Sequence, residues 1–327
     1  MIKAFVFGKY LPFHKGHEAM IKFALTQCDF LSVLICCSNK ENISGEIRKS
    51  WIVNSFPDQQ KLSVEIFDYR EEELPNTSVS SHEVSKIWAA QFKILFPDHT
   101  LLITSELYGE YVADYMKIKH IPFDQERNLV PISASAIRNN LSENWKYLSD
   151  KVKYFYVRKI VILGSESTGK TTLTKKLAQY FKAASVLETA REIIKDSQNF
   201  SLKDLYEVAT SHAEKITKEI EGEHHLLIID TDVHITQSYA NYRFGKMLEL
   251  TEDIYRVNKG DLYLYLCADA EYIQDGTRLE EQQRNLLDQS HRDILKKHNV
   301  SFYEITGSWD NRYEKSVELI KKFSFPS

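Results

Sequence analysis

The fold of the second half of the chain is decided by one stretch, Lys159-Ile160-Val161-Ile162-Leu163-Gly164-Ser165-Glu166-Ser167-Thr168-Gly169-Lys170-Thr171-Thr172. An apolar run leads into a turn bounded by two glycines, and an amphipathic segment follows as far as Phe181. This order predicts a buried strand, a tight loop and a helix.

The loop in this stretch fits the pattern G-x-x-x-x-G-K-[ST]. Backbone N–H groups of such a loop surround phosphate oxygens, the lysine reaches the terminal phosphates, and the next hydroxyl binds Mg²⁺. The strand before the loop and the helix after it are the context that the motif requires. We therefore expect a MgATP site formed by Gly164, Ser165, Glu166, Ser167, Thr168, Gly169, Lys170, Thr171 and Thr172.

A site of this kind also needs a carboxylate at the end of a second strand. The apolar run Leu226–Ile229 is followed by Asp230-Thr231-Asp232. Asp230 ends the run directly and suits the metal, together with Thr171. Asp232 suits the acceptor of the substrate hydroxyl's proton. The sequence leaves open which of the two aspartates is the base.

Two arginines further along the chain are candidates for binding ATP in this second half. Arg278 lies in Asp275-Gly276-Thr277-Arg278, a segment with the composition of a lid, and Arg284 follows it. Arginines on a mobile lid stabilise the charge that develops on the transferred phosphate. An exposed helix charge is the alternative interpretation of Arg284.

A second strand-turn-helix pattern opens the chain. The apolar run Ile2–Phe7 leads into Gly8-Lys9-Tyr10-Leu11-Pro12-Phe13-His14-Lys15-Gly16-His17 and then into an amphipathic segment. A helix that follows a strand in this way binds phosphate at its N-terminus, where N–H groups are unpaired. His14 and His17 can point into one pocket; as metal ligands they would lack an evident third partner.

This run resembles the G-K-F-x-P-x-H-x-G-H signature of the nucleotidylyltransferase superfamily, and most closely its nicotinamide mononucleotide adenylyltransferases. The second signature of that family, I-S-x-T-x-I-R, is matched by Ile132–Arg138, with Ser135 in place of threonine. The resemblance implies attack on the α-phosphate of ATP, with His14 and His17 on the phosphates and Arg138 on the departing pyrophosphate. It also implies an ATP-binding set of Gly8, Lys9, Gly16, Arg48, Ser133 and Ser135. A solvated helix arginine is the alternative for Arg48.

Both patterns in this order, over nearly the whole chain, resemble the NadR family, which joins such an adenylyltransferase to a ribosylnicotinamide kinase. The resemblance implies a substrate-binding acid and arginine after the second strand of the kinase, and it points to Glu188, Arg191 and Glu192. Relatives tend to have an aromatic-Gly pair before this arginine, whereas this chain has Thr189-Ala190. Nicotinamide is therefore expected to stack on other rings, Tyr239 or Tyr242. Some members add an N-terminal helix-turn-helix repressor domain, which we expect to be absent because the first strand begins at residue 2.

Alternating apolar runs and amphipathic segments predict an α/β fold with an open parallel sheet in each half. Strands are expected at Ile2–Phe7, Leu31–Cys36, Leu62–Phe67, Thr100–Thr104, Lys159–Leu163, Leu226–Ile229, Leu262–Cys267 and Val300–Ile305. Helices are expected at His17–Cys28, Ile47–Phe56, His82–Phe96 and Lys170–Phe181. We expect a Rossmann-like nucleotidylyltransferase domain over 1–145, a connecting segment over 146–158 and a P-loop kinase domain over 159–327.

The connecting segment is rich in aromatic residues and lysines, from Trp145 to Tyr156. A platform for nucleic-acid bases is one interpretation, and an apolar hinge between two domains is the other. The 42 basic and 46 acidic side chains give a formal charge of −4. Tight binding to nucleic acid needs a basic surface. The acidic total therefore favours the interpretation as an apolar hinge, and no nucleic-acid partner is expected.

Cysteine content and hydropathy indicate the compartment. The four cysteines show no metal-ligand spacing, which favours a reducing environment. No apolar run approaches the roughly 20 residues that span a bilayer. We therefore expect a cytoplasmic protein with no membrane partner, whose partners are small molecules; a homo-oligomer is left open.

Together, the patterns and the resemblance predict a bifunctional NAD salvage enzyme. Its kinase would phosphorylate nicotinamide riboside with MgATP, and its adenylyltransferase would convert nicotinamide mononucleotide and ATP to NAD and pyrophosphate. The motifs alone indicate phosphoryl and nucleotidyl transfer, and nicotinamide comes from the resemblance. The alternatives are the same two reactions on another vitamin nucleotide, such as that of riboflavin, and a nucleotide-binding regulatory sensor.

Overall fold

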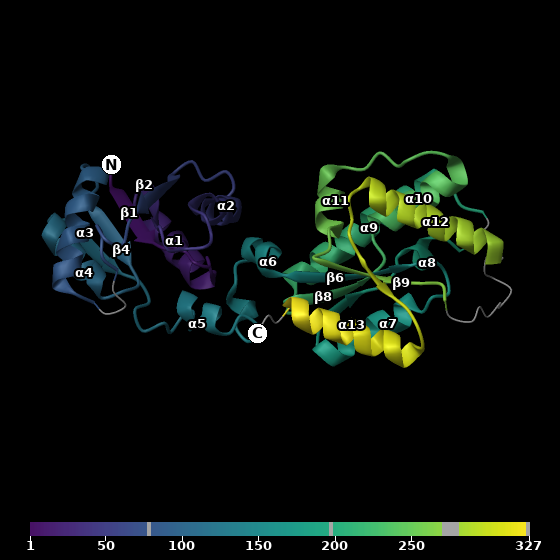
Figure 1. Ribbon diagram of the computed structural model, residues 1–327. Coiled ribbons are helices and arrows are strands. Elements are labelled where there is room, and N and C mark those ends of the chain that lie inside the picture. Colours follow the sequence, from purple (N-terminus) through teal and green to yellow (C-terminus); the bar gives the residue numbers. More distant parts are fainter. Residues whose placement is uncertain (77–79, 196–198, 270–280, 325–327) are drawn as a thin grey trace. The chain divides into compact units, whose positions relative to one another are not determined.

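The computed structural model describes residues 1–76, 80–195, 199–269 and 281–324 (Figure 1). It divides into two compact units, 1–155 and 156–327. Each unit contains one five-stranded sheet in which every neighbouring pair of strands is parallel. The α/β fold with two parallel sheets is therefore confirmed.

The first sheet has the strand order β3-β2-β1-β4-β5. Its strands are β1 (Lys3–Gly8), β2 (Phe30–Ser38), β3 (Leu62–Tyr69), β4 (Leu101–Thr104) and β5 (Lys119–Pro122). The chain reverses its direction of travel across the sheet between β1 and β4, and ligands of open α/β sheets bind at the carboxyl ends of such a strand pair. The expected strands are present, but the sequence analysis missed β5, a half-exposed edge strand with little apolar pattern.

Five α-helices follow these strands: α1 (Lys15–Gln27), α2 (Gly45–Ser55), α3 (His82–Leu95), α4 (Tyr108–Met116) and α5 (Ala134–Asn139). Figure 1 shows α3 and α4 side by side. Helix α3 carries Trp88 and Phe92 on one face, and Phe96 follows at its C-cap, so that the three rings pack against the sheet. The ring of Phe96 stacks on Phe5 of β1 at 4.6 Å between centroids.

The segment expected to connect the domains contains a short 3₁₀ helix, η1 (Trp145–Tyr147), and α6 (Asp150–Tyr156). Trp145 and Leu148 are fully buried. The hydroxyl oxygens of Ser55 and Ser149 are 3.1 Å apart, and the ring of Phe155 meets Trp51 edge-on at 5.3 Å. The segment up to Phe155 therefore packs on the first unit as part of its core.

The second sheet has the order β10-β9-β6-β8-β7. Its strands are β6 (Arg158–Gly164), β7 (Ala184–Val186), β8 (Leu226–Asp230), β9 (Leu262–Leu266) and β10 (Tyr303–Ile305). The described helices are α7 (Lys170–Phe181), α8 (Ala190–Ile193), α9 (Leu202–Glu221), α10 (Val233–Phe244), α11 (Glu252–Asn258), α12 (Glu281–Lys297) and α13 (Trp309–Ser324). In Figure 1, α7 and α13 lie on one face of this sheet and α9 to α12 on the other. Across the described ranges, no helix has both the length and the apolar character to cross a lipid bilayer.

Helix α4 begins against the end of β4 with almost no room for a side chain. A methyl group on Gly109 would collide with the hydroxyl of Thr104 and lie 2.8 Å from Nε2 of His120. These two partner groups are 2.9 Å from each other. The glycine therefore lets α4 pack at this point.

We predict that Gly109→Ala destabilises the first unit by about 1–3 kcal/mol, because the added methyl group must displace the Thr104–His120 pair. Urea denaturation followed by tryptophan fluorescence measures the loss. Glu110→Ala, an exposed neighbour in the same helix, is the matched control. Equal midpoints for the two variants would contradict the packing argument.

Candidate active sites

Two adjoining cavities of about 200 and 230 Å³ open beside the carboxyl ends of β1 and β4. His17, Ser135, Ser105 and Glu106 line both of them. Their walls also contain most of the residues expected to bind ATP in this unit: Gly8, Lys9, His14, Gly16, Ser133 and Arg138. The fold thus brings together the two sequence signatures, which are more than a hundred residues apart.

His14 is the N-cap of α1. Its Nδ1 accepts hydrogen bonds from the backbone N–H groups of Gly16 and His17, at 3.1 and 3.4 Å. An Nδ1 that accepts cannot carry a proton, so the neutral ring carries it on Nε2. Burial, followed by the charge of Arg127, lowers the pKa of His14 to about 4. His14 is therefore a neutral hydrogen-bond donor at pH 7.

The second histidine stacks on the first, with ring centroids 3.7 Å apart. Burial lowers the pKa of His17 well below its ordinary value, and the neighbouring His14 adds to the effect. The Nδ1 atom of His17 is buried and has no hydrogen-bond partner. A buried polar atom of this kind at a cavity wall is suited to a ligand.

The second signature forms the opposite wall through α5. Ser133 caps this helix by accepting a hydrogen bond from the N–H of Ala136 at 3.1 Å. Arg138 donates to the carbonyl oxygen of Leu11 and, at 3.0 Å, to the hydroxyl of Ser135. The arginine thus ties the two signatures together at the cavity rim while remaining exposed.

Arg48 does not reach these cavities, so its expected contact with ATP phosphates is not supported. Its side chain is 1% exposed and donates to the carbonyl oxygens of Ile43 and Lys9, and it pairs with Glu41 at 2.7 Å. The alternative of a solvated arginine is also wrong. Arg48 braces the backbone of Lys9, while Glu41 pairs with the Lys9 ammonium group at 3.0 Å.

This unit contains a third cavity, of about 230 Å³, which no sequence pattern predicted. Tyr69, Trp88 and Tyr108 supply aromatic walls, and Asn76 and Lys9 supply polar groups. It shares Lys9 and Tyr108 with the cavity that also contains Arg138, called here the ATP-side cavity, so the two cavities adjoin. These residues belong to separate helices and strands, so no regular spacing along the sequence connects them. The one sequence signal for the cavity was the presence of aromatic residues at strand ends and in helices. Arg127, on the ATP side, was missed as well; it pairs with Glu106 at 2.8 Å.

In the second unit, β6 turns into α7 through the glycine-bounded loop. Gly164 and Gly169 have φ angles of 141° and 86°, which favour glycine. A Cβ on Gly164 would also lie 2.6 Å from the carbonyl oxygen of Leu266. Helix α7 has no side-chain cap at its N-terminus, so the loop's N–H groups remain available for an anion. Lys170 donates to the carbonyl of Ser165 at 2.9 Å.

Asp230 ends β8 next to this loop. One of its carboxylate oxygens accepts a hydrogen bond from Thr171 at 2.5 Å, and the other is buried with no hydrogen-bond partner. Burial raises the pKa of Asp230, and the charge of Lys170 opposes this rise. A hydroxyl and a carboxylate oxygen side by side suit Mg²⁺, which prefers oxygen ligands. The residues present therefore fit the expected metal.

Asp232 is committed elsewhere, which corrects its expected role as a base. It caps α10 by accepting from the N–H groups of His234 and Ile235, and its other oxygen is 2.6 Å from Nδ1 of His234. Both oxygens are used and the residue is fully buried. Asp232 is therefore a buried cap that stabilises α10.

A second group of side chains faces Asp230. Tyr239 donates to Glu166 of the loop at 3.0 Å, and Arg191 pairs with Glu188 at 3.2 Å. Burial raises the pKa of both Asp230 and Tyr239, and the charge of Glu188 adds to both shifts. Glu166 and Tyr239 thus form one hydrogen-bonded pair beside the loop, and Glu188 and Arg191 form an ion pair whose charges act on Asp230.

Several expected residues do not join this group. Glu192 pairs with Lys215 at 2.6 Å beside a different cavity, and Tyr242 is 39% exposed. Arg284 is 4% exposed and donates to the carbonyl of Ala268, so it is no surface charge. Thr172 is exposed in the first turn of α7. Arg278 lies outside the described residues.

We predict that protonation of His14 destabilises the first unit, because an imidazolium cannot accept at the N-cap. The folded pKa is about 4 and the unfolded value near 6.5, so the unfolded chain takes up the proton first as the pH falls. The free energy of unfolding should drop by up to about 3 kcal/mol between pH 6.5 and 4. His14→Asn keeps a cap acceptor without titrating. If urea titrations give both proteins the same pH dependence, the cap assignment is wrong.

We also predict opposite behaviour of the two aspartates. Asp232→Ala should lower the free energy of unfolding by more than about 1 kcal/mol, since α10 loses its cap. Asp230→Asn should not lower it, because the substitution removes a buried charge, but it should abolish the stabilisation of the second unit by MgATP. Thermal unfolding with and without MgATP measures both, and a destabilised Asp230→Asn with intact MgATP response would reverse the assignment.

Comparisons with known proteins agree with this geometry. A family model described as an AAA domain matches residues 159–312. The protein named "Trifunctional NAD biosynthesis/regulator protein NadR" is 26% identical in Salmonella typhimurium and 27% identical in Escherichia coli. Each alignment covers 97% of this chain and 82% of the relative.

Two solved structures share the fold over nearly the full length. A NadR protein in complex with NR has a TM-score of 0.63 at 20% identity, covering 99% of this chain and 96% of the other. A NadR protein in complex with NAD and AMP-PNP has a TM-score of 0.60 at 20% identity, covering 100% and 97%. The chain is thus similar to NadR proteins in sequence and in fold over nearly its whole length, across both units.

Proposed function

We propose that this chain is a bifunctional enzyme of NAD biosynthesis, which phosphorylates nicotinamide riboside in its second unit and adenylylates nicotinamide mononucleotide in its first. The observation that carries the proposal is that each unit places basic side chains beside the start of a helix, in an arrangement suited to phosphate. The relatives' names refer to NAD biosynthesis, and related structures hold NR, NAD and an ATP analogue. These support the choice of substrate.

In the second unit, the riboside hydroxyl oxygen attacks the γ-phosphorus of ATP and the bond from that phosphorus to the bridging oxygen breaks. The loop N–H groups and Lys170 hold the phosphate oxygens. Thr171 and Asp230 would hold Mg²⁺, which supplies positive charge to the phosphates when it is bound. Glu188 accepts the hydroxyl proton, because its charge acts on Asp230 and its carboxylate, unlike that of Asp232, is partly exposed.

In the first unit, a phosphate oxygen of the mononucleotide attacks the α-phosphorus of ATP, and pyrophosphate leaves. The Nε2–H of His14 and the guanidinium of Arg138 stabilise the charge on the phosphate oxygens. The aromatic cavity of Tyr69, Trp88 and Tyr108 takes the pyridine ring of the mononucleotide. No covalent enzyme intermediate is needed, since positioning and charge supply the catalysis.

The direct test is one incubation of the purified chain with nicotinamide riboside and MgATP, followed by mass spectrometry. We expect nicotinamide mononucleotide and then NAD with pyrophosphate. Turnover of riboflavin instead would identify a different substrate, and thermal stabilisation by ATP or NAD without any turnover would identify a sensor.

Two variants should separate the activities. Lys170→Ala should lower riboside phosphorylation by more than about 100-fold and leave the adenylylation of supplied mononucleotide intact. His17→Ala should do the reverse, so each variant controls for folding of the other. Lys175→Ala, an exposed lysine of the same helix as Lys170, should keep both activities. Loss of both activities in either folded variant would contradict two independent sites.

A further inference from the structure

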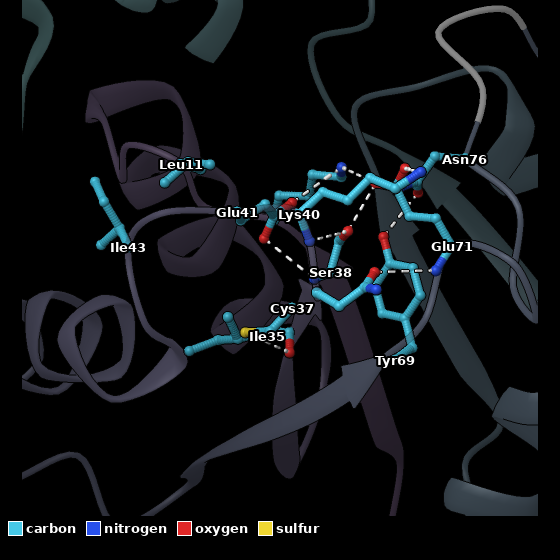
Figure 2. Close-up of polar contacts among 12 residues, drawn as sticks. Leu11, Ile35, Cys37, Ser38, Lys40, Glu41, Ile43, Tyr69, Glu71 and Asn76 are labelled. Atoms are coloured by element: carbon cyan, nitrogen blue, oxygen red, sulfur yellow. Dashed lines mark hydrogen bonds and ion pairs between the residues drawn. The ribbon is translucent and has the colours of Figure 1, made fainter.

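Glu71 lies just beyond β3, and Figure 2 shows its carboxylate among Ser38, Lys40 and Asn76. One oxygen of its carboxylate accepts hydrogen bonds from the hydroxyl of Ser38 at 2.7 Å and from the side-chain amide of Asn76 at 2.8 Å. The same oxygen is 3.9 Å from the ammonium group of Lys9, and the other oxygen is 3.3 Å from that of Lys40. These hydrogen bonds lower the pKa of Glu71, so it is charged at neutral pH.

On the cavity side, Glu71 sets the direction of a hydrogen-bond chain. An ionised carboxylate can only accept, so Asn76 must turn its NH₂ group toward Glu71 and its carbonyl oxygen away. That oxygen accepts from the hydroxyl of Tyr69 at 2.8 Å. The ring of Tyr69 meets Trp88 edge-on, at 5.0 Å and 84°. The orientation of one amide thus holds the aromatic wall of the cavity.

Glu71 also attracts Lys9, which belongs to the segment Gly8–His17 of the first unit. The ammonium group of Lys9 lies between Glu41 at 3.0 Å and Glu71 at 3.9 Å. Lysine has a long flexible side chain, and two carboxylates near its ammonium group restrict its conformations. Lys9 lines both the aromatic cavity and the ATP-side cavity, so its placement affects both substrates.

We propose that Glu71 is a positioning residue for adenylyl transfer, which presets with one carboxylate both the aromatic wall that receives the base of the mononucleotide and the lysine that faces its phosphate. The inference rests on the function proposed for the first unit. It requires a substrate with a planar aromatic base and a phosphate, since the carboxylate of Glu71 contacts both Asn76, which holds the aromatic wall, and Lys9.

Two substitutions separate the two effects. Glu71→Gln keeps an oxygen that can accept from Asn76 and Ser38 but removes the charge that attracts Lys9. Glu71→Ala removes both. The matched control is Glu72→Gln, because Glu72 is 62% exposed and its one described partner is Lys40 at 3.8 Å.

Steady-state kinetics of adenylylation with nicotinamide mononucleotide measure the outcome. We expect Glu71→Gln to lower kcat about tenfold with KM for the mononucleotide changed less than threefold. Glu71→Ala should raise that KM about tenfold in addition, and Glu72→Gln should match the wild type. Riboside phosphorylation serves as the internal measure of folding and should be unchanged in all three variants.

The inference is overturned if Glu71→Gln and Glu71→Ala both keep kcat and KM within twofold of the wild type. It is also overturned if both activities fall together, since that is the effect of general unfolding. Calorimetric titration with nicotinamide mononucleotide gives an independent reading, in which Glu71→Ala should bind about tenfold more weakly and equal affinity would contradict the role. A wild type that neither binds nor adenylylates the mononucleotide would instead refute the proposed function, and the inference with it.

Discussion

The structure depends on one constraint: a parallel strand that turns directly into a helix leaves the helix's first N–H groups unpaired at the carboxyl edge of the sheet. The two units meet this constraint differently. In the second unit, α7 has no side-chain cap, so its N–H groups remain free for phosphate. In the first, Nδ1 of His14 accepts from these groups, and the opposite edge of the ring, Nε2–H, becomes the donor. The second unit thus presents backbone N–H groups to an anion. The first unit presents the imidazole of His14, which backbone N–H groups hold in place.

Charge is arranged around both sites so that the cations are placed before any substrate arrives. In the first unit, Glu41 pairs with Lys9 and with the buried Arg48, and Glu71 lies beyond them. In the second, Lys170 bonds a loop carbonyl while Asp230 and Glu188 lie near it. Preorganised charges of this kind need little rearrangement when phosphate binds, which favours catalysis over simple retention of a ligand.

The parts of the fold that were predicted correctly are those with a local sequence pattern. The run from Gly8 to His17, the run from Gly164 to Thr171 and the apolar strands each carry their own local pattern, and the structure places them as expected. The errors concern side chains whose surroundings come from elsewhere. Arg48 looked like a phosphate ligand but is buried against Ile43 and Glu41, and Asp232 looked like a base but caps α10.

The sequence by itself determined two parallel α/β sheets and the two phosphate loops, because strand, turn and helix signals act over a few residues. Only the tertiary structure decided which charged side chains line a cavity and which take part in helix caps and ion pairs. It also created the aromatic cavity, since Tyr69, Trp88 and Tyr108 have no shared spacing and meet only when β3, α3 and α4 pack around the sheet. Burial and hydrogen-bond partners depend on contacts between distant segments, and no local pattern encodes them.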